Sequence, residues 1–220
     1  MASSYASSKS SFPQLLWATF ITVIAVISAL MLSTVARAAT ITVTTLSDPA
    51  GPSGTCSLRD AITAANTMAA TNGCAAGTGN DTIQFSVTGT IALASTLPAV
   101  TDANLMIKGP ASPGITIDGG GAVQVTVIAL GANVNLNHLT ISNGMAIEGG
   151  GIFNEGTLAV ANDIFSGNST DESGFNGGGG GIANTGNLTV ISSTFDGNNG
   201  YTRFNGLSRV GAAPSRMPAT

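Results

Sequence analysis

The chain has few charged residues, which make up 8% of its 220 positions. Long exposed helices are usually rich in Lys and Glu, so this shortage argues against a largely helical fold. The surface must instead be covered by Ser, Thr, Asn and Gly, and the 29 glycines are typical of β-proteins with many turns. Because Val, Ile and Leu are abundant, the low charge does not indicate disorder.

Basic residues are especially scarce in the body of the chain. All eleven acids lie between Asp48 and Asp196, and that stretch holds only two basic residues, Arg59 and Lys108. Nucleic-acid binding needs clustered Lys and Arg, so an acidic body disfavours it. Residues 201–220 differ, because they hold three Arg and no acid and lack the regular Gly and Asn punctuation of the preceding repeats. We expect this tail to be disordered or the scar of a truncation or frameshift.

The N-terminal segment lacks acids and has a long apolar stretch. An uncharged run leads from Lys9 to Arg37, with its most apolar part over 15–32, and it ends in a small-x-small sequence at 36–38. This pattern predicts a signal peptide over 1–38 and secretion to the exterior or surface of the cell. The alternative is an uncleaved membrane anchor, since about 18 apolar residues just span a bilayer.

Metal and cofactor ligands are few. The chain has two cysteines, Cys56 and Cys74, and one histidine, His138. In an exported chain an even pair of cysteines predicts a disulfide, and zinc would need further soft ligands. The glycine run at 177–181 lacks the Lys and Ser or Thr of a phosphate-binding loop, so we expect no cofactor. The pair at 171–172, Asp-Glu, suits weak calcium binding, but a solvated charge pair is favoured.

The main positive signal is a segment that recurs about thirty residues later. Gly-Gly-Gly-Ile at 149–152 recurs at 179–182, and Phe-x-x-Asn at 165–168 recurs at 195–198. A period of this size is typical of a solenoid, in which each repeat buries its apolar face against its neighbours. Short apolar strands separated by Gly and Asn run from residue 81 onward and predict the rungs of a β-helix.

Equivalent positions of the two repeats should lie one over the other. The stacked pairs predicted in this way are Ile152 with Ile182, Asn154 with Asn184, Phe165 with Phe195, and Asn168 with Asn198. Ile141 should extend the phenylalanine column, while residues around 170–176 bulge out as a loop. We interpret the asparagines as ladders that hydrogen-bond along the stack, in preference to ligand-binding groups.

One helix is expected in the exported part. Ser57 and Asp60 form a capping box, and apolar residues then recur at helical spacing as far as Met68. We expect this helix to cover the apolar end of the solenoid, the alternative being that it packs on the side. The predicted organisation is therefore a signal peptide (1–38), an N-terminal cap region (39–80), β-helix rungs (81–200) and the tail (201–220).

Two motifs resemble known families. Cys-Ser-Leu-Arg-Asp-Ala-Ile at 56–62, followed by Ala-Ala-Asn at 64–66, resembles the CSLREA domain of secreted bacterial β-helix proteins, with Asp60 in place of the family's Glu. The glycine repeats resemble those of chlamydial polymorphic outer-membrane proteins. Together the resemblance covers about 39–199. It implies an all-β, right-handed parallel β-helix, exported to the cell exterior or outer membrane and similar to adhesins.

Three functions remain open at this stage. The first is adhesion or surface display, in which a polar solenoid face offers Thr, Ser and Asn side chains to extracellular glycans or surface proteins. Any link to the membrane would come from the signal segment or from a C-terminal anchor. The second is a carbohydrate-active enzyme, a lyase or glycoside hydrolase. A lyase that acts on polyuronate needs a strong base and calcium held by clustered carboxylates, and a glycosidase needs two carboxylates across the scissile bond. The acids available for it are Asp102, Asp118, Glu148, Glu155, Asp163, Asp171, Glu172 and Asp196. The third is a structural spacer. His138 is expected to be a packed or edge residue.

Overall fold

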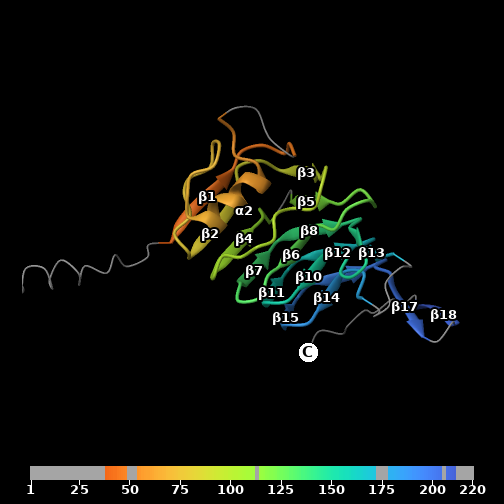
Figure 1. The fold of residues 1–220 in the computed structure, drawn as a ribbon. Helices are drawn as coiled ribbons and strands as arrows, with labels where there is room; N and C mark the ends of the chain where they lie inside the picture. The colour runs from red at the N-terminus through yellow and green to blue at the C-terminus, as the bar shows by residue number, and fades with distance from the viewer. Residues whose placement is uncertain (1–37, 49–53, 112–113, 172–177, 205–206, 212–220) are drawn as a thin grey trace, which may run out of the picture. The chain divides into compact units, whose positions relative to one another are not determined.

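The computed structural model describes residues 38–48, 54–111, 114–171, 178–204 and 207–211 (Figure 1). The predicted signal peptide lies outside these ranges, apart from Ala38. No helix within the described part of the chain is long and apolar enough to cross a membrane.

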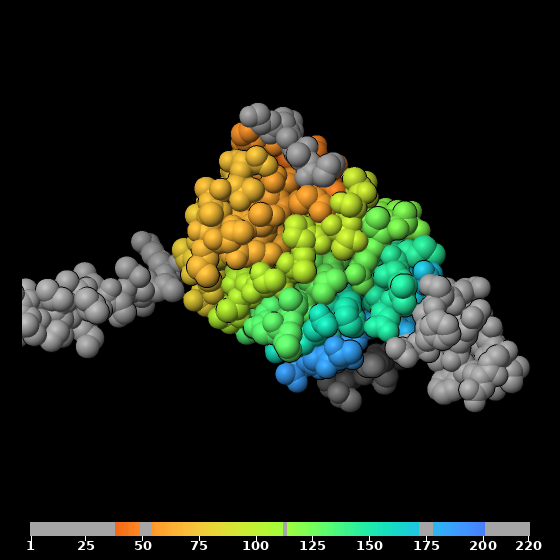
Figure 2. Space-filling model, in the orientation of Figure 1, coloured from red at the N-terminus to blue at the C-terminus, as the bar shows by residue number. Residues whose placement is uncertain are grey.

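The fold is a parallel β-solenoid of about four turns, here called coils, built around one apolar core. Successive coils add their strands to the same sheets, so neighbouring strands in a sheet are distant in sequence. Figure 2 shows the consequence: sequence-coloured bands succeed one another across the surface from the orange N-terminal region to the blue last coil.

Three parallel sheets form the walls. The six-stranded sheet contains, in spatial order, β1 (Ala39–Val43), β2 (Asp81–Phe85), β4 (Leu105–Lys108), β7 (Asn133–Asn137), β11 (Thr157–Ala161) and β15 (Asn187–Ile191). The five-stranded sheet contains β3 (Gly89–Ala92), β5 (Ile115–Asp118), β8 (Leu139–Ser142), β12 (Ile164–Ser166) and β16 (Thr194–Asp196). The three-stranded sheet contains β6 (Thr126–Ile128), β10 (Ile152–Asn154) and β14 (Ile182–Asn184).

Two smaller strand pairs complete the described structure. The two-residue strands β9 (Met145–Ala146) and β13 (Ser169–Thr170) are parallel. Strands β17 (Gly200–Phe204) and β18 (Leu207–Gly211) form an antiparallel hairpin. This hairpin falls in the region that was expected to be disordered, and residues 205–206 and 212–220 lie outside the description.

The strand register places equivalent residues of the two repeats side by side. Ile152 pairs with Ile182, and Phe165 pairs with both Ile141 and Phe195. The two phenylalanine rings are stacked, with centroids 4.8 Å apart and planes 4° apart. The column continues back through Ile117, which pairs with Ile141. A single apolar column therefore runs along the interior through successive coils.

The helix α2 (Leu58–Thr67) begins at its predicted cap. The Ser57 hydroxyl accepts a hydrogen bond from the Asp60 N–H at 3.1 Å and donates one to Asp60 Oδ2 at 2.7 Å. In sequence α2 lies between β1 and β2, which pair in register, so the six-stranded sheet begins upstream of the helix. Leu58 and Ile62 project into the interior, where they cover the first coils as a cap would.

A disulfide joins Cys56 to Cys74 within the cap region, as predicted. Cys56 and Cys74 are both buried, with Cα atoms 4.7 Å apart. The bridge links the residue before the Ser57 helix cap to the loop that follows α2, so it restrains the helix against the first coils.

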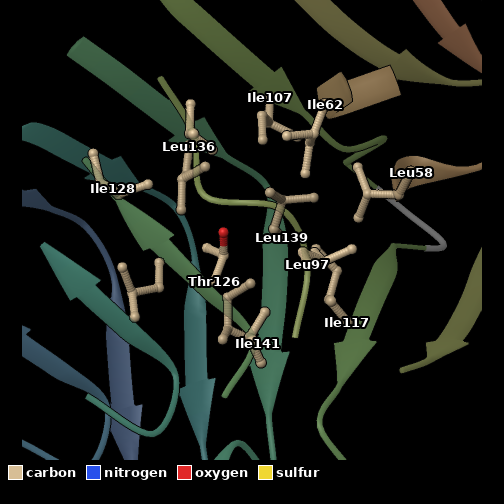
Figure 3. A pocket seen from close by; sticks show the side chains of 13 residues that line it. Leu58, Ile62, Leu97, Ile107, Ile117, Thr126, Ile128, Leu136, Leu139 and Ile141 are labelled. Atoms are coloured by element: carbon tan, nitrogen blue, oxygen red, sulfur yellow. The ribbon is translucent and has the colours of Figure 1, made fainter. Parts of the chain in front are cut away.

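Inside the solenoid there is a small apolar cavity (Figure 3). Leu58 and Ile62 line it from the helix, and Ile107, Leu136 and Ile141 are among the strand residues around it. Thr126 contributes its oxygen, which donates to the Pro98 carbonyl at 3.4 Å. A cavity with so few polar groups is a packing gap in the core, and it does not have the character of a binding site.

Candidate functional site

The candidate site is an open groove across three successive coils, with a volume of about 420 Å³. It lies over the turns that lead into β7, β11 and β15 (Figure 1). Its lining residues are Leu130, Gly131, Ala132, Asn133, Glu155, Gly156, Thr157, Thr185, Gly186 and Asn187.

Glycines bring the turns of the groove into close contact. A Cβ at Gly156 would lie 2.6 Å from the carbonyl oxygens of Ala129 and Ala132, and one at Gly186 would lie 2.0 Å from the Gly156 carbonyl oxygen. Because real Cβ atoms do not approach backbone so closely, only glycine fits at these positions. The floor of the groove is therefore backbone, stacked turn upon turn.

Polar side chains line the groove at regular intervals. Asn133, Thr157 and Asn187 are register partners in neighbouring strands, so they are separated by the strand spacing of about 4.8 Å. Asn133 Nδ2 donates to Asn104 Oδ1 at 3.1 Å, which extends the polar row by one coil. Thr157 and Asn187 are exposed to solvent. The arrangement offers amide and hydroxyl groups repeated along one direction.

The groove lining has one charged residue and one exposed large apolar residue. Among the lining residues, Glu155 is the one that carries a charge. Leu130 is 86% exposed at the edge. Such a surface can hydrogen-bond an uncharged ligand and offers a small apolar contact beside it.

The asparagines of the repeats are not among the residues that line this groove. Asn154 Nδ2 donates to Asn184 Oδ1 at 2.5 Å, and Asn168 Nδ2 donates to Asn198 Oδ1 at 2.9 Å. Asn168 Oδ1 also accepts from the Gly144 N–H at 2.8 Å. Asn154 and Asn168 are fully buried, so their amides are used in joining coils.

Asp163 was a candidate catalytic acid, but it is buried and held by backbone. Its two carboxylate oxygens accept hydrogen bonds from the N–H groups of Leu139, at 2.8 Å, and Ala161, at 2.9 Å. Burial raises the pKa of Asp163 to about 6, although these two amides and the nearby His138 favour the charged form. Its place inside the wall gives it a structural role at the turn.

His138 occupies the turn between β7 and β8. Its backbone has a φ of 57°, and the following coils have φ of 59° at Asn162 and 47° at Ser192 in the corresponding turns. The ring Nδ1 is hydrogen-bonded to the side-chain oxygen of Asn137. His138 is thus a partly buried turn residue, away from the groove lining.

Two buried carboxyl groups, those of Asp81 and Asp102, lie next to each other, which the sequence did not predict. Burial, followed by the neighbouring Asp81 carboxyl, raises the pKa of Asp102, while the Asn104 N–H opposes the shift. Asp102 Oδ2 has no hydrogen-bond donor from an amide or hydroxyl group. Asp81 is held by the Thr78 N–H at 2.9 Å and the Gly79 N–H at 3.3 Å. Sequence gave no signal, because nothing in the spacing of 81 and 102 indicates that the side chains meet.

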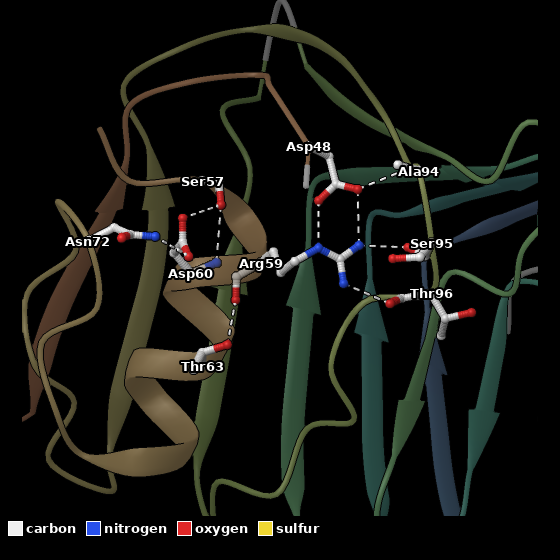
Figure 4. A network of polar contacts seen from close by, with 9 residues as sticks. All are labelled: Asp48, Ser57, Arg59, Asp60, Thr63, Asn72, Ala94, Ser95 and Thr96. Atoms are coloured by element: carbon white, nitrogen blue, oxygen red, sulfur yellow. Dashed lines mark hydrogen bonds and ion pairs between the residues drawn. The ribbon is translucent and has the colours of Figure 1, made fainter. Parts of the chain in front are cut away.

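Arg59, one of the two basic residues of the body, is used in fixing the cap (Figure 4). Its guanidinium makes a bidentate ion pair with Asp48, at 2.8 and 3.0 Å, and donates to the carbonyls of Ser95 and Thr96. Asp48 in turn accepts from the Ala94 N–H at 2.9 Å. The network joins α2 to the loop after β3 and leaves the guanidinium no free edge for a substrate.

A metal site is not formed by the residues that the structure describes: none of their His, Cys, Asp and Glu side chains gather in groups of three or more. Of the acidic pair at 171–172, Glu172 lies outside the described residues.

Protein-family models, curated proteins and solved structures were all compared with the chain, and none of them matches it. The fold is therefore established by the structure, and the resemblance to CSLREA and polymorphic outer-membrane proteins stays a prediction.

Proposed function

We propose that the protein is a secreted or cell-surface adhesion module whose groove binds an extended, uncharged glycan. The observation that carries the proposal is the row of Asn133, Thr157 and Asn187, in register over a glycine floor. A glycan chain lying across the coils would present hydroxyls along its length, and this row presents amide and hydroxyl partners at regular steps.

The charge of the protein favours an uncharged ligand over an anionic one. The body carries eleven acids and two basic residues, and Arg59 is committed to Asp48. An acidic surface repels polyuronates and sulfated chains unless cations intervene. One of these eleven acids, Glu155, lies in the groove lining itself.

Export is supported by two independent features. The N-terminal sequence has the pattern of a signal peptide, and the cysteines form a disulfide, which persists in oxidising compartments. An exported, exposed solenoid is suited to contacts with glycans outside the cell.

The proposal is tested by measuring binding of the purified protein to neutral glycans of defined length. Asn187→Ala and Thr157→Ala should each weaken binding about fivefold, since a lost hydrogen bond costs about 1 kcal/mol. The matched control is Thr140→Ala, an outward threonine of the five-stranded sheet that lies outside the groove. Binding that is absent, or that the control weakens equally, would refute the groove as the site.

The enzymatic alternative rests on Glu155, the one carboxylate of the groove lining. A glycosidase needs a second carboxyl group across the scissile bond. Incubation of the bound glycan with the wild-type protein and with Glu155→Gln would separate the two functions. New reducing ends that appear with the wild type and not with the variant would support catalysis, and intact glycan supports binding alone.

A further inference from the structure

Within the described part of the chain, the last coil of the solenoid has three strands whose outer edges are unpaired. Strands β14, β15 and β16 each stand at the end of their sheet. The strands that follow, β17 and β18, pair with each other and with none of these three. Among the described residues, therefore, nothing continues the three sheets beyond this coil.

Side chains that are buried in the preceding coil are exposed in the last one. Val160 is fully buried, whereas its register partner Val190 is 40% exposed. Phe165 is likewise buried, and its partner Phe195 is only partly so. The apolar column of the solenoid thus reaches the surface at this end.

The backbone of β15 also has hydrogen-bonding groups that find no partner among the described residues. The Asn187 N–H donates to Gly156 and the Ile191 carbonyl accepts from Asn162, so both residues face the preceding coil. Peptide groups alternate in direction along a strand. The N–H and C=O groups of Leu188 and Val190 therefore point to the open edge.

Features that usually protect an edge strand are missing from β14 and β15, although β16 carries Asp196. Exposed edges are commonly blocked by charged residues, proline or bulges. Strands β14 and β15 contain neither a charged residue nor a proline. An uncharged edge with apolar side chains behind it is suited to pairing with another strand.

At the opposite end, β1 is the other edge strand of the six-stranded sheet, with α2 packed against it and with Leu58 and Ile62 over the interior. A last coil that paired with β1 of a second copy would extend into an open head-to-tail filament, whereas pairing between two last coils closes the assembly. We propose that two copies associate through their last coils, tail to tail about a two-fold axis, with β15 pairing antiparallel to β15. With the two-fold axis at Thr189, the outward N–H and C=O groups of Leu188 would bond to those of Val190 in the second copy. Because the same surface is used by both copies, this contact would close the assembly.

The test is the mass of the full chain in solution, measured by light scattering over a range of concentrations. The wild type should form dimers, and Val190→Lys should raise the dissociation constant at least about tenfold. Met106→Lys is the matched control: Met106 is also 40% exposed and lies in the same sheet, but in a strand paired on both sides. A monomer at all concentrations, an open filament, or equal effects of the two variants would overturn the proposal.

A second measurement does not depend on disrupting the edge. A Thr189→Cys side chain is exposed and would lie opposite its copy, where Cα atoms of an antiparallel non-hydrogen-bonded pair are about 4.5 Å apart. Mild oxidation should link Thr189→Cys into covalent dimers faster than Met106→Cys. Equal rates would contradict the two-fold pairing.

Discussion

The two ends of the solenoid are built from similar strands but are finished differently. At the first end, α2 inserts Leu58 and Ile62 over the apolar interior, and the Cys56–Cys74 bridge holds the helix in place. At the last coil, the same kind of interior residue is left partly exposed at Phe195. The comparison shows that a side chain of a repeat is fully buried only where neighbouring coils cover it on both sides. The same motif therefore has a different role in an inner coil and in the last coil.

The largest expected effect is in the phenylalanine column, where the buried Phe165 is compared with the partly exposed Phe195. Phe165→Asp should lower the free energy of unfolding by more than about 4 kcal/mol, because it places an unpaired charge in a fully buried position. Phe195→Asp should cost about half as much, since water reaches its edge. Urea unfolding followed by circular dichroism measures both. Equal losses would mean that Phe195 is also enclosed, and would contradict an open last coil.

The disulfide sharpens the comparison at the capped end. The bridge spans 18 residues, so replacing Cys56 and Cys74 by Ser should cost about 3 kcal/mol. Amide hydrogen exchange should accelerate in α2 before it does in β11, because the helix loses its restraint. Uniform acceleration through all coils would show that the cap and the coils unfold as one unit.

A carboxylate inside one coil gives stability a pH dependence. The folded pKa of Asp163 is about 6, above the ordinary value of 3.8, so the protonated form is the one that folding favours. This contribution is complete below pH 3.8 and is lost as the pH rises through 6, by up to about 3 kcal/mol.

The corresponding residue of the last coil is Ser193, whose hydroxyl accepts from the Asp163 N–H at 3.1 Å. Because asparagine does not titrate, Asp163→Asn should remove this part of the pH dependence of stability. Unfolding curves between pH 4 and 7 measure the difference from the wild type. Parallel curves for the two proteins would rule out Asp163 as its source.

The smallest effects concern the asparagine ladder. Asn168→Ala should cost about 2 kcal/mol, because it leaves the Gly144 N–H and the Ile141 carbonyl without a buried partner. Asn198→Ala should cost about 1 kcal/mol, since water can replace it at the partly exposed last coil. Thermal unfolding of the two variants gives the order. A reversed order would show that the ladder is strongest at its end.

Much of the fold could be predicted from the sequence because the tight turns between strands favour glycine and asparagine, and these residues mark where each turn lies. Gly-Gly-Gly-Ile and Phe-x-x-Asn recur at one offset, and the structure pairs Ile152 with Ile182 accordingly. The capping box predicted the start of α2 in the same way, since Ser57 and Asp60 interact locally. These signals lie within a few residues of each other, or repeat at one spacing.

The groove and the buried acids could not be predicted, for a different reason. The turn at 130–133 has no repeat motif in common with those at 155–157 and 185–187, so the sequence does not indicate that it extends the groove. Likewise Asp81 and Asp102 meet because β2 pairs with β4, which brings the loop before β4 next to Asp81. Contacts of this kind depend on loop lengths that no local pattern records.

The central claim is that coils thirty residues apart lie in register, and cysteine pairs test it directly. Ile164 and Thr194 are register partners with exposed side chains on the five-stranded sheet. The double variant Ile164→Cys/Thr194→Cys should form an intramolecular disulfide on mild oxidation, detected by mass spectrometry. The account predicts a much slower reaction for Ile164→Cys/Asp196→Cys, which is two residues out of register. Faster linkage of that second pair, or no linkage of the first, would contradict the stacked solenoid.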